Sequence, residues 1–193
     1  MKQKVAIIGD GNVGSAIQKG LQRAGYELKV SGNDPAKVRE AAAWAELVIL
    51  AVPYWALDDV LREMGDGVSG KTLVDATNAL TPDYRLALGF TTSGAEELQN
   101  KAPRAKVVKA FNTVFAGSMS TGKVKGQTLT LFAAGDDAGA RDQVLSLGRA
   151  IGFDAVDAGP LMNARWLEAL GFLNIQLGFT LKMGAEIGFK LVH

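Results

Sequence analysis

The stretch VAIIGDGNVGSAI, residues 5–17, decides the fold of this chain. Gly9, Gly11 and Gly14 form a Gly-x-Gly-x-x-Gly pattern directly after an apolar run that reads as a short buried strand. The residues after the glycines keep apolar side chains at helical spacing. This order of strand, glycine turn and helix favours a dinucleotide-binding loop over an ordinary tight turn. In such a loop Gly9 permits the turn, Gly11 lets a pyrophosphate approach, and Gly14 lets the helix pack on the strand.

The composition indicates a folded chain, because 48% of its 193 residues are hydrophobic. A formal net charge of +1 gives no basic footprint, so we expect no nucleic-acid partner. The absence of cysteine excludes disulfides and thiolate catalysis and fits a cytoplasmic location. We expect no export signal, since the first strand begins almost at once. The apolar segment 169–181 is too short for a bilayer, so we predict a buried helix and no membrane contact.

Apolar runs alternate with helical or loop segments along most of the chain. This alternation predicts an α/β fold with a doubly wound parallel sheet, of the dinucleotide-binding Rossmann type. Only residues 34–46 separate the second and third runs, so the usual third strand is expected to be missing. We predict a dinucleotide-binding domain over residues 1–158 and a small helical part over 159–193. The runs are residues 5–8, 28–30, 47–52, 72–74, 107–111 and 128–133.

Small or uncharged polar clusters follow five of these runs. In an open sheet of this kind ligands bind beyond the carboxyl ends of the strands. Each proline or asparagine there is by itself ordinary loop punctuation, and Tyr54 and Trp55 are equally compatible with core aromatics. Together the clusters favour a ligand with amides, hydroxyls and an aromatic ring. Beyond the glycine loop and the second strand, the candidate cofactor-binding residues are Val52, Pro53, Tyr54, Asn78, Phe111, Asn112 and Ala116.

The corner after the second strand decides which dinucleotide is expected. An NAD enzyme usually carries an acidic residue there, which holds the ribose hydroxyls. This chain has Ser31, Gly32 and Asn33 instead, with Lys37 nearby, so NADP is favoured. Asp34 argues for NAD if its side chain turns inward.

The candidate site is poor in groups that move protons. The only histidine is His193, the last residue, and we expect neither catalysis from it nor a metal site. Lys109 is a base if it is buried, but a strand lysine that reaches solvent is the favoured interpretation. Hydride exchange between a nicotinamide and a second redox cofactor requires no protein acid. We therefore favour transfer between cofactors. A small-substrate reductase with Lys109 as proton donor, and a nucleotide-binding sensor without turnover, are the alternatives.

The motifs GDGNVG, VPYW and KAFNTV, and above all DAGPLMNARWLEAL at 157–170, resemble the NADP oxidoreductases that use the deazaflavin coenzyme F-420. The oxidoreductase domain of membrane metalloreductases carries similar motifs. The resemblance spans nearly the whole chain, and implies reversible hydride transfer between NADPH and the deazaflavin. It also implies groups of contact residues: Asp10, Gly11, Asn12 and Val13 at the pyrophosphate, Gly32, Asn33 and Lys37 at the 2'-phosphate, and Val52, Asn78 and Ala116 on the nicotinamide side.

Two positions depart from the family pattern. Gly32 and Asn33 replace its usual Ser-Arg pair, which weakens the inference of NADP. Asn112 and Thr113 stand where the archaeal deazaflavin enzymes carry a histidine before the threonine, as in the metalloreductase-type sequences. The resemblance therefore leaves the hydride acceptor open between the deazaflavin and a flavin.

From Asn163 onward the pattern predicts a helix with two apolar stripes, which must be covered from two sides. The chain's own domain covers one side. Gly171 and Gly178 would let a second helix approach on the other, so we favour a symmetric homodimer over a helix sunk in a monomer's core.

Overall fold

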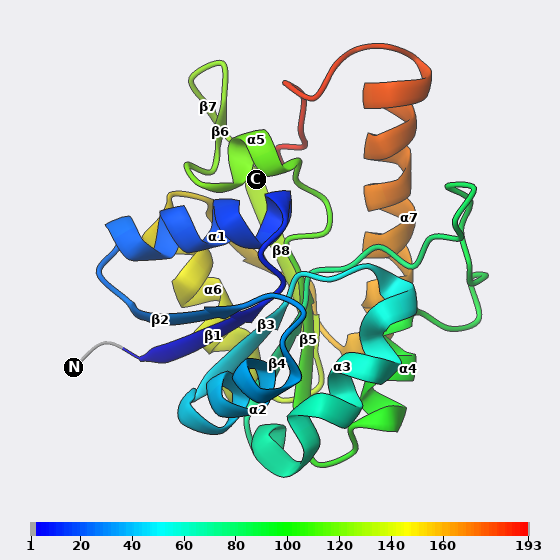
Figure 1. Ribbon diagram of the computed structural model, residues 1–193. Helices are drawn as coiled ribbons and strands as arrows, with labels where there is room; N and C mark the ends of the chain where they lie inside the picture. The colour runs from blue at the N-terminus through cyan, green and yellow to red at the C-terminus, as the bar shows by residue number, and fades with distance from the viewer. Residues whose placement is uncertain (1–2, 193) are drawn as a thin grey trace.

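One seven-stranded sheet with helices on both faces forms the fold (Figure 1). The structure is a computed structural model, which describes residues 3–192. The strands lie in the order β2, β1, β3, β4, β5, β8, β9. Since β2 is the edge strand beside β1, the missing third strand is confirmed for the described residues. The strand bounds are β1 Lys4–Ile8, β2 Glu27–Ser31, β3 Leu47–Leu50, β4 Thr72–Asp75, β5 Lys106–Ala110, β8 Thr130–Gly135 and β9 Asp154–Asp157.

The strand β8 departs from the predicted parallel order. Strands β1 to β5 pair in parallel, whereas β8 runs antiparallel to β5 and β9 lies parallel to β8. A parallel return requires a long crossover, usually a full helix, across one face of the sheet. Between β5 and β8 the chain forms only the single-turn helix α5 (Ala116–Met119) and a hairpin of β6 (Lys123–Val124) and β7 (Gln127–Thr128). The chain therefore comes back antiparallel, and the expectation was wrong for this strand.

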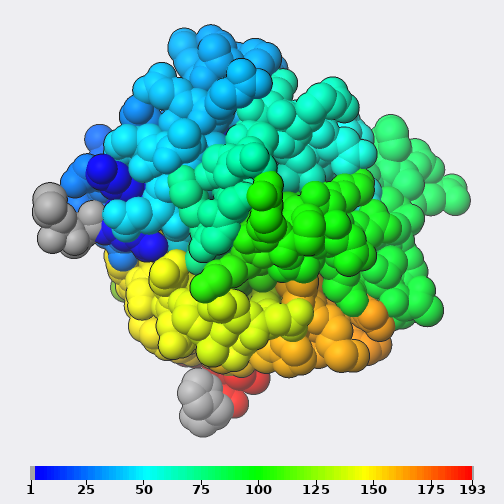
Figure 2. Space-filling view, turned by 90° about the horizontal axis from the view of Figure 1, so that it is seen from below, coloured from blue at the N-terminus to red at the C-terminus, as the bar shows by residue number. Residues whose placement is uncertain are grey.

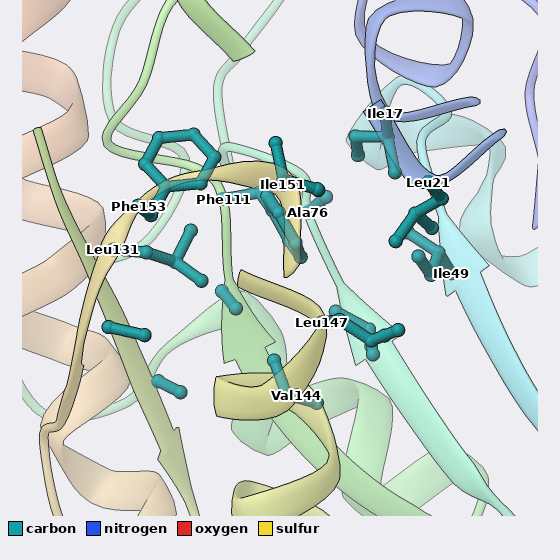
Figure 3. Packing of buried hydrophobic residues seen from close by; sticks show 14 of the residues in the cluster. Ile17, Leu21, Ile49, Ala76, Phe111, Leu131, Val144, Leu147, Ile151 and Phe153 are labelled. Carbon is teal, nitrogen blue, oxygen red and sulfur yellow. The ribbon is translucent and has the colours of Figure 1, made fainter. Parts of the chain in front are cut away.

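The strands present alternate residues to two separate cores, which confirms the doubly wound arrangement. Val5 and Ile7 of β1 face the core under α1 and α6, and Figure 3 shows side chains of both helices in this cluster. Ala6 and Ile8 face the core under α2, α3 and α4. The helix bounds are α1 Asn12–Arg23, α2 Pro35–Trp44, α3 Leu57–Met64, α4 Gly94–Lys101 and α6 Ala138–Ile151, with short 3-10 turns at Tyr54–Ala56, Gly65–Val68 and Leu161–Asn163.

The C-terminal part consists of α7 (Ala164–Ile175), a π-helical turn at Gln176–Thr180 and an irregular segment to residue 192. The predicted helix is thus confirmed from Ala164 to Thr180. The prediction that segment 169–181 is buried was wrong, because Leu173 is 49% exposed, Phe179 64% and Leu181 65%. The end of the chain returns to β8, where the Phe189 carbonyl accepts a hydrogen bond from the Thr130 amide at 3.0 Å. The domain boundary predicted after residue 158 stays a prediction, and His193 lies outside the described residues.

Apart from Leu167, the buried stripe of α7 consists of small and polar residues. It packs on the chain's own domain through Ala164, Gly171, Asn174 and the following Gly178. A Cβ on Gly178 would lie 2.8 Å from the Phe115 ring, so the two glycines serve an internal contact and their assignment to a dimer interface was wrong. In the space-filling view the surface of α7, in orange, adjoins that of α4, in green (Figure 2). No helix within residues 3–192 is long and apolar enough to cross a bilayer.

Candidate functional site

In the glycine loop between β1 and α1, two glycines have no room for a side chain and one has free space beside it. Gly9 has a φ of +112°, and a Cβ there would lie 2.2 Å from the Ala51 carbonyl oxygen. A Cβ on Gly14 would lie 1.8 Å from the Gly9 carbonyl oxygen. A Cβ on Gly11 would meet nothing within 4 Å. Gly9 and Gly14 are therefore required by the fold, whereas the space beside Gly11 is open to a ligand.

The helix α1 begins at this loop, and its first turn has no side-chain cap. Gly11 is the N-cap residue and has no side chain that could accept hydrogen bonds from the first turn. The first turn of α1 also carries no acidic residue. Asn12 and Val13 lie in this turn, and the pyrophosphate contact that the resemblance implies for them stays a prediction.

The corner after β2 lies beside the glycine loop and includes Asp10 and residues 31–37. Ser31 is buried, and its hydroxyl has no hydrogen-bond partner among the described residues. Asn33 and Lys37 are exposed. Asp34 turns toward α2, where its Oδ1 accepts hydrogen bonds from the amides of Ala36 at 3.0 Å and Lys37 at 3.3 Å. Its second oxygen lies 3.8 Å from the Lys37 ammonium.

The segment after β3 contributes Val52 to the loop and directs Tyr54 elsewhere. A Cβ on Gly9 would lie 3.2 Å from Val52, so this side chain packs on the loop, just before Pro53. The Tyr54 hydroxyl donates a hydrogen bond of 2.6 Å to Glu97 of α4. Burial, followed by this hydrogen bond and the charge of Glu97, raises the pKa of Tyr54. Trp55 is 73% exposed, which excludes the core position considered for it.

Asn78 and Asn112 form an amide pair at the ends of β4 and β5. Asn112 Nδ2 donates to Asn78 Oδ1 at 3.1 Å, and Asn78 Nδ2 donates to the Asn112 carbonyl at 3.1 Å. Asn112 also donates to the Leu167 carbonyl of α7 at 2.8 Å. Gly171 of the same helix packs on the pair. The structure thus brings these two predicted residues together, and it adds α7, which the sequence did not indicate as part of the site.

The two remaining candidates differ in where their side chains lie. Phe111 has a φ of +70° and is 1% exposed. Its ring packs edge-on against Phe153 in the core, so only its backbone is available to a ligand. Ala116 is half-buried at the start of α5. The assignment of the predicted residues to a bound cofactor stays a prediction.

Lys109 lies in a fully buried ionic cluster below the amide pair. Its ammonium is 2.9 Å from Asp75 and 2.9 Å from Glu168 of α7, and it donates to the Thr77 carbonyl at 2.7 Å. Burial opposes its charge, but the two carboxylates outweigh burial and raise the pKa of Lys109. The expectation that it reaches solvent was wrong. The sequence shows Lys109 inside the apolar run 107–111 and Asp75 directly after the run 72–74, but only the structure shows that they stand opposite each other on neighbouring strands.

Glu168 ties this cluster to α4. Its carboxylate accepts hydrogen bonds from the Gly94 amide at 3.0 Å and the Ala95 amide at 3.3 Å, in the first turn of α4. No group of three or more metal-ligating side chains occurs within residues 3–192. The site offers the backbone amides of the first turn of α1, the side-chain amides of Asn78 and Asn112, and the Ser31 hydroxyl.

A mostly parallel doubly wound sheet with this glycine loop defines the Rossmann-type fold. Residues 4–43 match the family model described as "NADP oxidoreductase coenzyme F420-dependent". The F420-dependent NADP reductase of Methanothermobacter marburgensis is 35% identical over 176 residues, covering 84% of this chain and 75% of that protein. The chain belongs to the family of F420-dependent NADP reductases.

Two further comparisons extend this result. The crystal structure of a putative F420-dependent NADP reductase from Arthrobacter sp. FB24 superposes with a TM-score of 0.91 at 29% identity, over 99% of this chain and 100% of that one. Metalloreductase STEAP3 of Rattus norvegicus is 30% identical over 86% of this chain. The chain spans only 36% of that metalloreductase, so the similarity concerns about a third of its length.

Proposed function

We propose that the chain binds NADP(H) at the glycine loop and exchanges hydride with a deazaflavin or flavin. The open space beside Gly11, at the uncapped amino terminus of α1, is the observation that carries this proposal. A dinucleotide pyrophosphate needs free space and unpaired backbone amides of this kind. Gly9 and Gly14, which have no room for a side chain, fix the backbone of the loop. When bound, the nicotinamide and the acceptor ring supply the redox chemistry themselves.

The chain's own residues would hold and orient these groups. Backbone amides of Asn12 and Val13 are available to the pyrophosphate, and Val52 limits the loop on its β3 side. The Asn78–Asn112 pair presents a rigid amide surface, because its groups bond to each other and to α7. Such a surface positions a ring without titrating, which suits a reaction that needs no protein acid.

The alternative of a small-substrate reductase finds no support in the site. It requires a proton donor, and Lys109 was the candidate. That side chain has no exposed surface, and its ammonium contacts Asp75, Glu168 and the Thr77 carbonyl. A buried lysine held in this way is not available to donate a proton to a substrate.

An NADPH oxidation screen tests the proposed function. NADPH is incubated with the chain and, in separate assays, with F420, FMN, FAD or a ferric chelate, while absorbance at the nicotinamide band is followed. Turnover with F420 or a flavin supports the proposal. Binding of NADPH with no turnover by any acceptor would instead favour the nucleotide-binding sensor, and turnover with the ferric chelate alone would move the acceptor outside the proposed class.

We further propose a homodimer formed through the outer face of α7. On α7, Trp166 is 56% exposed and Leu173 49%, and large exposed apolar side chains of this kind mark an interface. Leu173→Glu should lower the mass seen by light scattering, whereas Val192→Glu, at a residue 84% exposed and outside the helix, should not. A wild type that is monomeric at micromolar concentration contradicts the dimer.

A cytoplasmic location is also proposed, and the absence of cysteine from the sequence supports it.

A further inference from the structure

The carboxylate of Asp10 lies where a side chain of residue 32 would stand. A Cβ on Gly32 would be 2.5 Å from Asp10 Oδ2 and 3.0 Å from Oδ1. Gly32 follows β2 directly, at the corner where NAD-binding proteins of this fold usually carry an acidic residue. The corner therefore does hold a carboxylate, which comes from the glycine loop instead of from the second strand.

Within residues 3–192 the Asp10 carboxylate has no hydrogen bond or ion pair, and the residue is exposed. Only its main-chain carbonyl is engaged, by the Ser15 hydroxyl at 2.9 Å. Asp34 differs, since its carboxylate caps α2 and lies near Lys37. Lys37, the one cation predicted for a 2'-phosphate, is thus shared with Asp34. Together with Asp10, the corner presents two carboxylates to one ammonium.

We infer that Asp10 sets the choice between the two nicotinamide dinucleotides. Its free carboxylate can accept hydrogen bonds from the 2'-hydroxyl of an NAD ribose. The same carboxylate repels the 2'-phosphate of NADP, which Asn33 and Lys37 attract. Asp10 therefore offsets the preference for NADP, and the chain takes NADH alongside NADPH. This inference rests on the proposed function only in that a dinucleotide binds at the glycine loop.

Dissociation constants for NADPH and NADH, measured by calorimetry on the wild type and on Asp10→Asn, test this inference. The wild type should bind the two within about tenfold of each other. Asp10→Asn should bind NADPH about tenfold more tightly and NADH no more tightly, because the repulsion and the ribose acceptor are both lost. The exposed position of Asp10 keeps the variant folded, and a circular dichroism melt checks this.

Glu27→Gln is the matched control. It removes one negative charge from the opposite end of β2, where Glu27 is exposed. The ratio of the two dissociation constants should change by less than about threefold in this variant. Gly32→Ala provides an independent route, since its Cβ would displace the Asp10 carboxylate without removing it. It should shift the ratio toward NADPH as Asp10→Asn does.

The outcomes separate the inference from the proposed function. A wild type that binds neither dinucleotide overturns both. Binding of NADPH with the same ratio in Asp10→Asn as in the wild type overturns the inference alone. A wild type that binds NADPH about a hundredfold or more tightly than NADH also overturns the inference alone, because Asp10 then does not weaken the preference for NADPH.

Discussion

The glycine loop and the Lys109 cluster lie at the same edge of the sheet and are built in opposite ways. In the loop, Gly11 leaves open space, the first turn of α1 has no cap, and the Asp10 carboxylate has no partner among the described residues. In the cluster, Lys109 contacts two carboxylates and a carbonyl, and Glu168 also accepts hydrogen bonds from two backbone amides. Polar groups without protein partners mark the region prepared for a ligand.

The cluster, by contrast, is closed and fixes position. It links β4, β5, α4 and α7, and so holds α7 against the Asn78–Asn112 pair. An unpaired polar group at a surface costs little, whereas an unpaired charge in a core costs several kcal/mol. Changes in the cluster should therefore affect stability, and changes in the loop should affect binding.

The largest effect is expected for Lys109→Met. It leaves Asp75 and Glu168 buried without their cation, so the free energy of unfolding should fall by about 3–5 kcal/mol. Urea unfolding followed by circular dichroism measures this loss. Lys101→Met is the control, because the Lys101 side chain is 46% exposed beside Asp58 and the loss of this ion pair should cost less than about 1 kcal/mol. Equal stability of the two variants would contradict a cluster that fixes α7.

A smaller loss of stability is expected for Gly171→Ala. The added Cβ would lie 2.5 Å from Asn78 Oδ1 and 2.8 Å from Asn112 Nδ2. Overpacking of this kind costs about 1–3 kcal/mol. Gly117→Ala, whose Cβ would meet nothing within 4 Å, should be neutral in the same unfolding experiment. If Gly171→Ala were as stable as the control, α7 would not pack on the amide pair as described.

A substitution at Gly11 of the glycine loop should change the affinity for NADPH and not the stability of the fold. Gly11→Ala puts a methyl group where a phosphate would approach, and NADPH affinity should fall about tenfold, or about 1.4 kcal/mol, with unchanged stability. Calorimetry gives the affinity, and Gly89→Ala, another position where a Cβ meets nothing within 4 Å, is the control. Gly14→Ala should unfold the chain instead, since its Cβ would meet the Gly9 carbonyl. Unchanged NADPH affinity in Gly11→Ala would remove the loop from the binding site.

The same contrast explains how far the sequence could be interpreted. The glycine loop was predictable because its geometry depends on residues close together in the chain, and glycine spacing reports it directly. The missing third strand followed from the length of the segment before β3. The antiparallel β8 was not predictable from its apolar pattern, because direction depends on the connection before it, and β9, DAVD, has an acid at each end and no apolar run.

Contacts between distant segments account for the remaining failures. Lys109 appeared to be a surface residue because its partner Glu168 comes from a helix whose position the sequence did not indicate. The spacing of Gly171 and Gly178 showed a close approach, but not whether the approaching surface belonged to the same chain. The position of Asp10 against Gly32 depends on a side-chain direction, which no residue pattern reports. Local backbone geometry could thus be predicted, and pairing between distant charges could not.

The smallest effect concerns a second link between α4 and α7, which is partly exposed and so lies between the two regions. Glu96 accepts hydrogen bonds from Arg165 at 2.9 and 2.6 Å and from the Ser93 hydroxyl at 2.7 Å. The hydrogen bond from Arg165, aided by Ser93, outweighs burial and holds the pKa of Glu96 below its ordinary 4.5. Because the folded pKa is lowered, this stabilisation is present above about pH 4.5 and is lost as the pH falls through the folded pKa.

Glu96→Gln should therefore be less stable than the wild type at neutral pH, by about 1 kcal/mol or less for a partly exposed pair. The difference should shrink as the pH falls below 4.5, because the wild-type carboxyl then also becomes neutral. Urea unfolding between neutral pH and pH 3 measures both curves, with Glu186→Gln, at an exposed residue outside the helices, as the control. A stability difference that stays constant across this range would mean that the charge of Glu96 contributes nothing and that α4 and α7 are held by the Lys109 cluster alone.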